Sequence, residues 1–253
     1  MIHFLRRKRK QLSDDNKVLK YLKYAFGEII LVVLGILIAL QINNWNQRRL
    51  EHAIEQSYLI RLKNELTKDA AYLNYSFDQT EKEINKVTLG LQTAYEIENN
   101  KEDINKLLGL HSFYAEALTI NKATYDDLVS TQNLNIIRND SLRFLIVDYY
   151  RNAEQAARAI DHFNQLAWDM QIEYMSAIPV GKYYSWNIDM FADEKLNYKE
   201  DFSFINKPTS YEYKLMETFQ ILFLNKHGNL LHFYKDLKIQ ATEINDLINQ
   251  ELE

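Results

Sequence analysis

The chain has 253 residues, of which 26% are charged and 47% are hydrophobic, so a folded protein of one or two domains is expected. Gly (6) and Pro (2) are scarce, which favours long helices over a sheet with many turns. The absence of cysteine excludes a disulfide framework, a thiolate zinc site and a cysteine nucleophile.

The net charge of −5 is unevenly distributed along the chain. Residues 1–23 contain eight Lys or Arg and two Asp, a net charge of +6, so the other 230 residues carry −11. In a nucleic-acid-binding protein the folded domain itself is basic, whereas here the body is acidic. We therefore expect no nucleic-acid partner.

An apolar stretch follows the basic head. Residues 29–40 are twelve consecutive apolar residues, and with its flanks the stretch from Phe26 to Trp45 is twenty residues long. Twenty residues of helix span about 30 Å, the thickness of the hydrocarbon layer of a membrane. Tyr21, Tyr24 and Trp45 stand at positions where aromatic side chains anchor a helix at the membrane interface.

Two other interpretations of this stretch are weaker. A cleavable signal peptide needs a small-x-small cleavage site, but the bulky and polar QINNWNQRR follows. A buried core helix would not explain the preceding cations. We therefore interpret residues 24–46 as a transmembrane signal anchor, residues 1–23 as a cytoplasmic tail and residues 47–253 as an external domain. The cations that set this topology, or alternatively bind anionic lipid, are Arg6, Arg7, Lys8, Arg9 and Lys10.

One face of the span could contact another membrane helix. Glu28, Gly35, Ala39 and Ile42 recur at offsets of 0, 7, 11 and 14, which places them on one side of a helix. Small residues such as these let helices approach closely in membranes. The alternative for Glu28 is that its carboxylate reaches the headgroups and binds lysine or lipid amines.

The external domain is expected to be helical. The first helix continues from the span to about Ile97, with a coiled-coil-like stripe from Leu66 to Ala94. ENNKED then forms a turn. Further helices are predicted over residues 104–118, 122–129, from a cap at Asn139 or Asp140 to Pro179, and from Pro208 to the C-terminus.

The apolar stripes of these helices must be buried against one another. The expected fold class is therefore all-α: a transmembrane helix that continues into an extracytoplasmic antiparallel helical bundle with coiled-coil-like stripes. Gly228 could break the last helix in two, but one continuous helix is favoured.

The segment 180–207 shows no regular pattern and is predicted to be irregular. It contains four large aromatic residues that could contact a partner: Tyr183, Tyr184, Trp186 and Phe191. The alternative is that these side chains fold back over the open end of the bundle.

The sequence carries no signature of a known reaction. Among the six histidines there is no HExxH, and none has a glutamate three residues earlier, as a di-iron bundle requires. No P-loop, GxGxxG or GxSxG occurs. We expect no enzymatic activity, no catalytic residue, no metal and no cofactor.

Two blocks of the chain resemble a known family. GEIILVVLGILIALQINNWNQ (Gly27 to Gln47), after a basic N-terminus, and ATYDDLVSTQNLNIIRNDSLRFLIVDYY (Ala123 to Tyr150) are similar to an uncharacterised family of small single-pass membrane proteins of bacteroides-type Gram-negative bacteria. That family usually has a glycine near Gln132. The resemblance implies an inner-membrane protein with a periplasmic C-terminal part, and it implies no activity.

The function expected from these features is that of a membrane-anchored periplasmic scaffold or adaptor, which acts through protein–protein contacts. The alternative is a periplasmic sensor or small-ligand-binding module that signals through a partner subunit, because a 23-residue tail has little with which to signal. The expected partners are membrane lipid, an unknown membrane or periplasmic protein, and a second copy of the chain.

Overall fold

The computed structural model describes residues 17–96, 117–178 and 202–253. Its described residues form four α-helices and two short 3₁₀ helices, and no strand occurs among them. The chain divides into two compact units, residues 1–57 and 58–253, and each is described by itself. The all-helical part of the expected fold class is therefore confirmed.

Helix α2 runs without a break over Lys17–Glu96. The apolar stretch and the following stripe therefore belong to one helix, as expected, and its described residues reach Glu96, next to the expected end at Ile97. From Leu66 to Ala94, every residue of the predicted stripe is buried or half-buried. The spacing of these apolar residues matches the helix period, so one side of the helix enters the core.

Helix α4 covers Ala123–Ser130, and the 3₁₀ helix η1 covers Asn133–Ile136. The prediction of a helix over residues 122–129 is therefore off by one residue. Ala117 and Leu118, the described end of the helix expected over 104–118, are not helical. These residues contact α2 instead, because the hydroxyl of Tyr72, a residue of α2, donates to the Ala117 carbonyl oxygen at 3.0 Å.

Helix α5 covers Asp140–Ala177, and its start is as expected. Asn139 caps it, because the Leu142 N–H donates to the Asn139 Oδ1 at 3.0 Å.

Helix α7 covers Tyr211–Leu252, so it starts later than Pro208. Ser210 provides the cap, since its Oγ accepts from the Tyr213 N–H at 3.2 Å. Gly228 does not break α7.

The segment predicted to be irregular contains a short ordered element at its end. The 3₁₀ helix η4 covers Ser203–Asn206 and buries Phe204 and Ile205. Residues 179–201, with the aromatic residues proposed as a contact segment, lie outside the described residues, as does the ENNKED turn.

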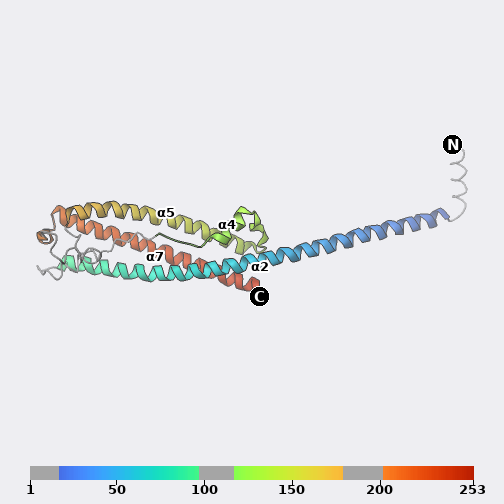
Figure 1. Cartoon of the computed structure of the whole chain (residues 1–253), viewed down its shortest axis with the longest axis horizontal. Coiled ribbons are helices and arrows are strands. Elements are labelled where there is room, and N and C mark those ends of the chain that lie inside the picture. The colour runs from blue at the N-terminus through green and yellow to red at the C-terminus, as the bar shows by residue number, and fades with distance from the viewer. Residues whose placement is uncertain (1–16, 97–116, 179–201) are drawn as a thin grey trace, which may run out of the picture. The chain divides into compact units, whose positions relative to one another are not determined.

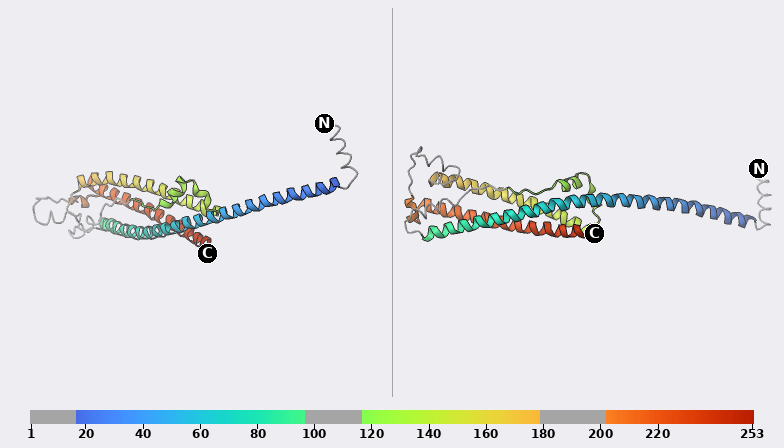
Figure 2. Two further views of the ribbon diagram at one scale, coloured as in Figure 1. Left: turned by 45° about the vertical axis from the view of Figure 1, so that its right-hand side comes forward. Right: turned by 60° about the horizontal axis from the view of Figure 1, so that its bottom comes forward.

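In the second unit, the part of α2 after residue 57 lies alongside α5 and α7 (Figures 1 and 2). Side-chain hydrogen bonds fix the directions. Lys238–Asn74 and Asn245–Thr67 show that α7 runs antiparallel to α2. Asn139–Glu251 and Asn152–Gln240 show that α7 also runs antiparallel to α5. It follows that α2 and α5 run in the same direction. In an up-down bundle, by contrast, two long helices that follow each other in the chain would run in opposite directions.

The apolar interior of this unit is formed by two clusters. The first cluster joins Leu59–Leu73 of α2, Leu142–Ile160 of α5 and Leu230–Ile248 of α7. The second cluster is centred on Tyr174 of α5, Phe204 of η4 and Phe219 of α7. The Tyr174 and Phe219 rings stack with centroids 4.7 Å apart.

Candidate functional site

The apolar stretch of α2 exposes its side chains on every side. Its 18 most apolar consecutive residues are not buried, and the helix is long and apolar enough to cross a membrane. A surface helix of a soluble protein has an apolar stripe on one face only, whereas apolar residues on all faces suit a lipid environment.

The residues of the predicted association face share one side of this helix. Glu28, Gly35, Ala39 and Ile42 are all exposed. A Cβ added to Gly35 would meet no atom within 4 Å, so no contact within the described chain requires the glycine. This face is therefore open among the described residues.

The expected interfacial anchors are only partly described. Tyr21 and Trp45 are exposed, and the Arg49 guanidinium lies over the Trp45 ring at 5.8 Å from its centroid. This cation–π pair was not predicted, although the spacing of four residues is the signal for it. The Tyr24 side chain and the topology residues 6–10 lie outside the described parts of the chain.

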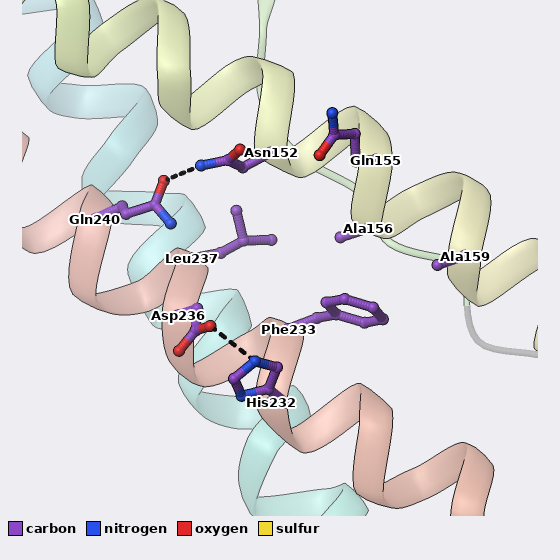
Figure 3. Close-up of a pocket in the computed structure, with 9 residues that line it drawn as sticks. All are labelled: Asn152, Gln155, Ala156, Ala159, His232, Phe233, Asp236, Leu237 and Gln240. Atoms are coloured by element: carbon purple, nitrogen blue, oxygen red, sulfur yellow. Dashed lines mark hydrogen bonds and ion pairs between the residues drawn. The ribbon is translucent and has the colours of Figure 1, made fainter.

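A groove between α5 and α7 is a candidate site that the sequence did not reveal (Figure 3). Its volume is about 390 Å³. Its residues come from two turns of each helix: Asn152, Gln155, Ala156, Ala159, His232, Phe233, Asp236, Leu237 and Gln240. The methyl groups of the two alanines are too short to fill the space that larger residues would take, and this leaves the hollow.

Polar groups surround the groove and apolar groups form its floor. At one end, the Asn152 Nδ2 donates to the Gln240 Oε1 at 3.0 Å. On the α7 side, His232 Nε2 lies 3.2 Å from Asp236 Oδ2, and both side chains are exposed to solvent. Ala156 and Leu237 are buried at the floor. A groove of this kind can bind an apolar group and orient it by amide and carboxylate contacts.

A buried carboxylate on α2 fixes the returning chain. Asp69 is fully buried and accepts from the Asn121 backbone N–H at 2.9 Å, from Asn121 Nδ2 at 2.6 Å and from the Tyr149 hydroxyl at 3.0 Å. Burial raises the pKa of Asp69, and the hydrogen bonds oppose this shift. The same burial, with the nearby Asp69 charge, raises the pKa of Tyr149.

One turn earlier on α2, Glu65 binds the start of α4. Its Oε1 accepts from the Thr124 hydroxyl at 2.7 Å, and both carboxylate oxygens are 3.2 Å from the Thr124 N–H. The Tyr125 and Tyr150 rings stack beside this contact at 4.3 Å between centroids. Together with Asp69, these contacts hold α4 against α2, so this cluster is structural in role.

Between the two apolar clusters, α7 buries several polar side chains beside Phe223. On α7, Gln220, Lys226 and His227 are buried. Both amide atoms of Gln220 lack a hydrogen-bond partner among the described residues. Burial lowers the pKa of His227 to about 4, and its Nδ1 lies 2.8 Å from the Phe223 carbonyl oxygen. His227 is therefore neutral at pH 7.

Within the parts of the chain that the structure describes, no three His, Asp or Glu side chains are grouped as metal ligands would be.

The comparisons with known proteins support one part of the resemblance seen in the sequence, namely that the chain belongs to an uncharacterised family. No curated protein and no solved structure matches the chain. A family model, described as "Family of unknown function (DUF6090)", matches residues 28–209. This match covers most of the apolar stretch, α4, α5 and η4. Because it extends over well more than half of the 253 residues, the chain belongs to this family of unknown function.

Proposed function

We propose that the protein is a membrane-anchored scaffold or adaptor, which acts through protein–protein contacts and not through catalysis. The observation that carries the proposal is the fully exposed apolar stretch of α2, joined in one chain to a helical unit with its own core. An anchor of this kind would hold the helical unit at a membrane surface, where it would act by binding other proteins.

The proposed location is a bacterial inner membrane, with the N-terminus in the cytoplasm and residues 47–253 in the periplasm. The net charge of +6 on residues 1–23 supports this orientation. Single cysteines at Lys10 and Asn99 test it, since the natural chain has none. They should react with a membrane-impermeant maleimide from opposite sides, and reaction from the same side would refute the topology.

We also propose that the long helices form a bundle outside the membrane through coiled-coil-like stripes, and that the chain can self-associate through the span. The buried stripe of α2 and the open face with Gly35 and Ala39 support these two points.

The scaffold proposal is tested by chemical crosslinking in native membranes, followed by identification of what is recovered with the chain. Discrete larger species that contain a second protein are expected. If the chain is recovered only as a free monomer at every crosslinker concentration, the scaffold proposal is refuted.

The groove favours one other candidate, a small-ligand-binding module. Its volume of about 390 Å³ falls within the range of ligand sites. A thermal-shift screen of the full chain in detergent distinguishes this candidate, because a ligand that binds the folded state raises the unfolding temperature. Stabilisation by one class of solute, lost on Ala159→Trp, would favour the binding module over the scaffold.

A further inference from the structure

The turn of α2 that follows the apolar stretch holds a guanidinium in a defined position. Arg49 lies four residues after Trp45, and its guanidinium carbon is 5.8 Å from the centroid of the Trp45 ring. The Arg49 Nη2 donates to the Asn46 Oδ1 at 3.3 Å. Both partners precede Arg49 in the helix, so its side chain runs back along α2 toward the apolar stretch.

No carboxylate among the described residues pairs with this guanidinium. Residues 43–52 contain two cations, Arg48 and Arg49, and one anion, Glu51, a net charge of +1. Glu51 is two residues from Arg49, and residues two apart do not face each other on a helix. Its Oε1 accepts instead from the Gln47 Nε2 at 3.0 Å. The guanidinium thus meets a neutral amide and a ring, and an anion is the group that would complement it.

The same turn offers further donors and an apolar surface. One guanidinium N–H of Arg49 is used by Asn46, which leaves four for another acceptor. The Asn46 Oδ1 accepts this bond, and its Nδ2 makes no hydrogen bond to a described residue. Trp45 is 64% exposed, so its ring provides apolar surface beside these donors. An oxyanion that carries an apolar tail fits this set, because a guanidinium binds phosphate oxygens in pairs.

The place of this turn along α2 indicates which anion it would meet. Trp45 ends the apolar stretch, and tryptophan rings of membrane proteins lie at the level of the lipid headgroups. Four residues of helix rise about 6 Å, but the Arg49 side chain turns back and brings its guanidinium beside the ring. At that level of a bilayer the abundant anion is the phosphate of a phospholipid.

We infer that Trp45, Asn46 and Arg49 form a binding site for the phosphate of a phospholipid, in the leaflet that borders residue 49. The inference rests on the proposed membrane anchor and names the lipid chemistry that holds it. A cation on this side of the span runs against the charge asymmetry that sets the topology. A phosphate site gives Arg49 a role that the asymmetry does not.

The test measures which lipid lies next to Trp45. Trp168→Phe and Trp186→Phe leave Trp45 as the only tryptophan of the full chain, which is the parent for all variants. The parent is reconstituted in vesicles that mix phosphatidylglycerol, brominated on its acyl chains near the headgroup, with an uncharged galactosyl diacylglycerol. Bromine quenches tryptophan fluorescence on contact. Since hydrogen bonds to charged groups are strong, phosphatidylglycerol should be enriched at Trp45 by about tenfold over its share of the vesicle.

Variants distinguish a site from bulk charge. Arg49→Gln should abolish the enrichment, and Arg49→Lys should keep part of it, because lysine retains the charge but not the planar fork. Arg48→Gln is the matched control, since it removes the same charge from a residue about 100° around the helix, and it should keep the enrichment. Brominated phosphatidylethanolamine, which shares the phosphate but has no net charge, should be enriched as well. Circular dichroism shows whether each chain is folded.

Several results would overturn the inference. Equal enrichment in the parent and in Arg49→Gln is one, and equal losses in Arg49→Gln and Arg48→Gln, which indicate diffuse charge, are another. Loss of the enrichment in inorganic phosphate would identify a site for the free anion. Enrichment that appears only when the chain is diluted in lipid would identify a carboxylate of a second copy as the usual partner of Arg49.

The anchor and the lipid site fail in different ways. If no brominated lipid quenches Trp45, the membrane anchor is refuted and the site with it. If brominated lipid quenches Trp45 without any preference for phospholipid, the anchor stands and only the site is refuted. Crosslinked partners that persist in Arg49→Gln would leave the scaffold proposal unaffected in either case.

Discussion

Gln132 is the only described non-glycine residue with a positive φ, and its replacement by glycine gives the sharpest stability prediction. Its backbone angles are φ 59° and ψ 24°, in the left-handed helical region. It lies between α4, which ends at Ser130, and η1, which begins at Asn133. Residues 131 and 132 form the turn between these two elements.

The magnitude follows from two opposing contributions. An L-residue in the left-handed region costs about 1–2 kcal/mol, and glycine avoids this cost. Glycine has more freedom in the unfolded chain, which reduces the gain by about 0.5–1 kcal/mol. The Gln132 side chain is exposed and makes no capping hydrogen bond, so little else is lost. Gln132→Gly should therefore raise the free energy of unfolding by about 0.5–1 kcal/mol.

The assay is urea unfolding of the full chain in detergent, followed by circular dichroism at the helix band. Thr131→Gly is the matched control, because Thr131 has φ −88° and its hydroxyl donates to the Asp127 carbonyl at 2.6 Å. Glycine there relieves no strain, so this variant should be less stable than the natural chain. If Gln132→Gly lowers the urea midpoint as Thr131→Gly does, the left-handed conformation assigned to Gln132 is wrong.

Four further predictions concern three buried polar residues, and urea unfolding measures each of them. Asp69→Ala should lower the free energy of unfolding by about 2–3 kcal/mol, because it leaves three donors without an acceptor. Burial raises the pKa of Asp69 above 3.8 in the folded state, so the folded state binds the Asp69 proton more tightly than the unfolded state does. The stability that this proton contributes is full below pH 3.8 and is lost as pH rises through the folded pKa. Asp69→Asn should remove this loss, and an unchanged pH profile of the free energy of unfolding would contradict the prediction. Gln220→Met should raise stability by about 1–2 kcal/mol by removing an amide with no described partner, whereas the exposed control Gln165→Met should not. The His227 pKa is lowered from 6.5 to about 4, so stability should be full above pH 6.5 and fall by about 3 kcal/mol as pH approaches 4; a His227→Gln chain with the same loss would refute this.

Local chemistry explains which helix ends could be predicted. Asn139 or Asp140 was expected as the cap of α5, and Asn139 caps it. The prediction was possible because the capping contact joins residues only three apart. The start of α7 was misplaced at Pro208 for a related reason. Proline is compatible with a first turn, but Ser210 supplies the side-chain oxygen that satisfies an N–H of the helix.

Long-range pairings could not be predicted in the same way. Asp69 stands beside an apolar stripe, and a periodicity argument assigns a carboxylate to the solvent side of a helix. Asp69 is nevertheless fully buried, since its partners Asn121 and Tyr149 are 52 and 80 residues away. A single sequence does not show which distant donors meet a given acceptor. The groove was missed for the same reason, because Ala156 and Asp236 come from different helices.

Gly228 shows how tertiary contacts outweigh local preference. A glycine within a helix costs about 1 kcal/mol, enough to make a break plausible from sequence. In the structure its neighbours Lys226, His227 and Leu230 are buried, so the helix on both sides is held by packing. Burial of one large apolar side chain such as that of Leu230 contributes about 1.5–3 kcal/mol, which exceeds the cost of the glycine.

The polar layer on α7 also predicts how the helical unit opens. Leu230–Ile248 belongs to the first apolar cluster and Tyr213–Phe219 to the second. Between them α7 buries Gln220, Lys226 and His227, with Phe223 as the one buried apolar residue of this stretch. Cooperative units of a protein are held together by contiguous apolar contacts, and buried polar groups interrupt these contacts. The two parts of α7 should therefore exchange amide hydrogens with different opening free energies, lower for Tyr213–Phe219, although no residue breaks the helix. Hydrogen exchange with mass spectrometry measures both parts in one chain. A single opening free energy along all of α7 would show that the buried polar residues do not separate the clusters. If the two opening free energies differ as expected, Gln220→Met should bring them closer together.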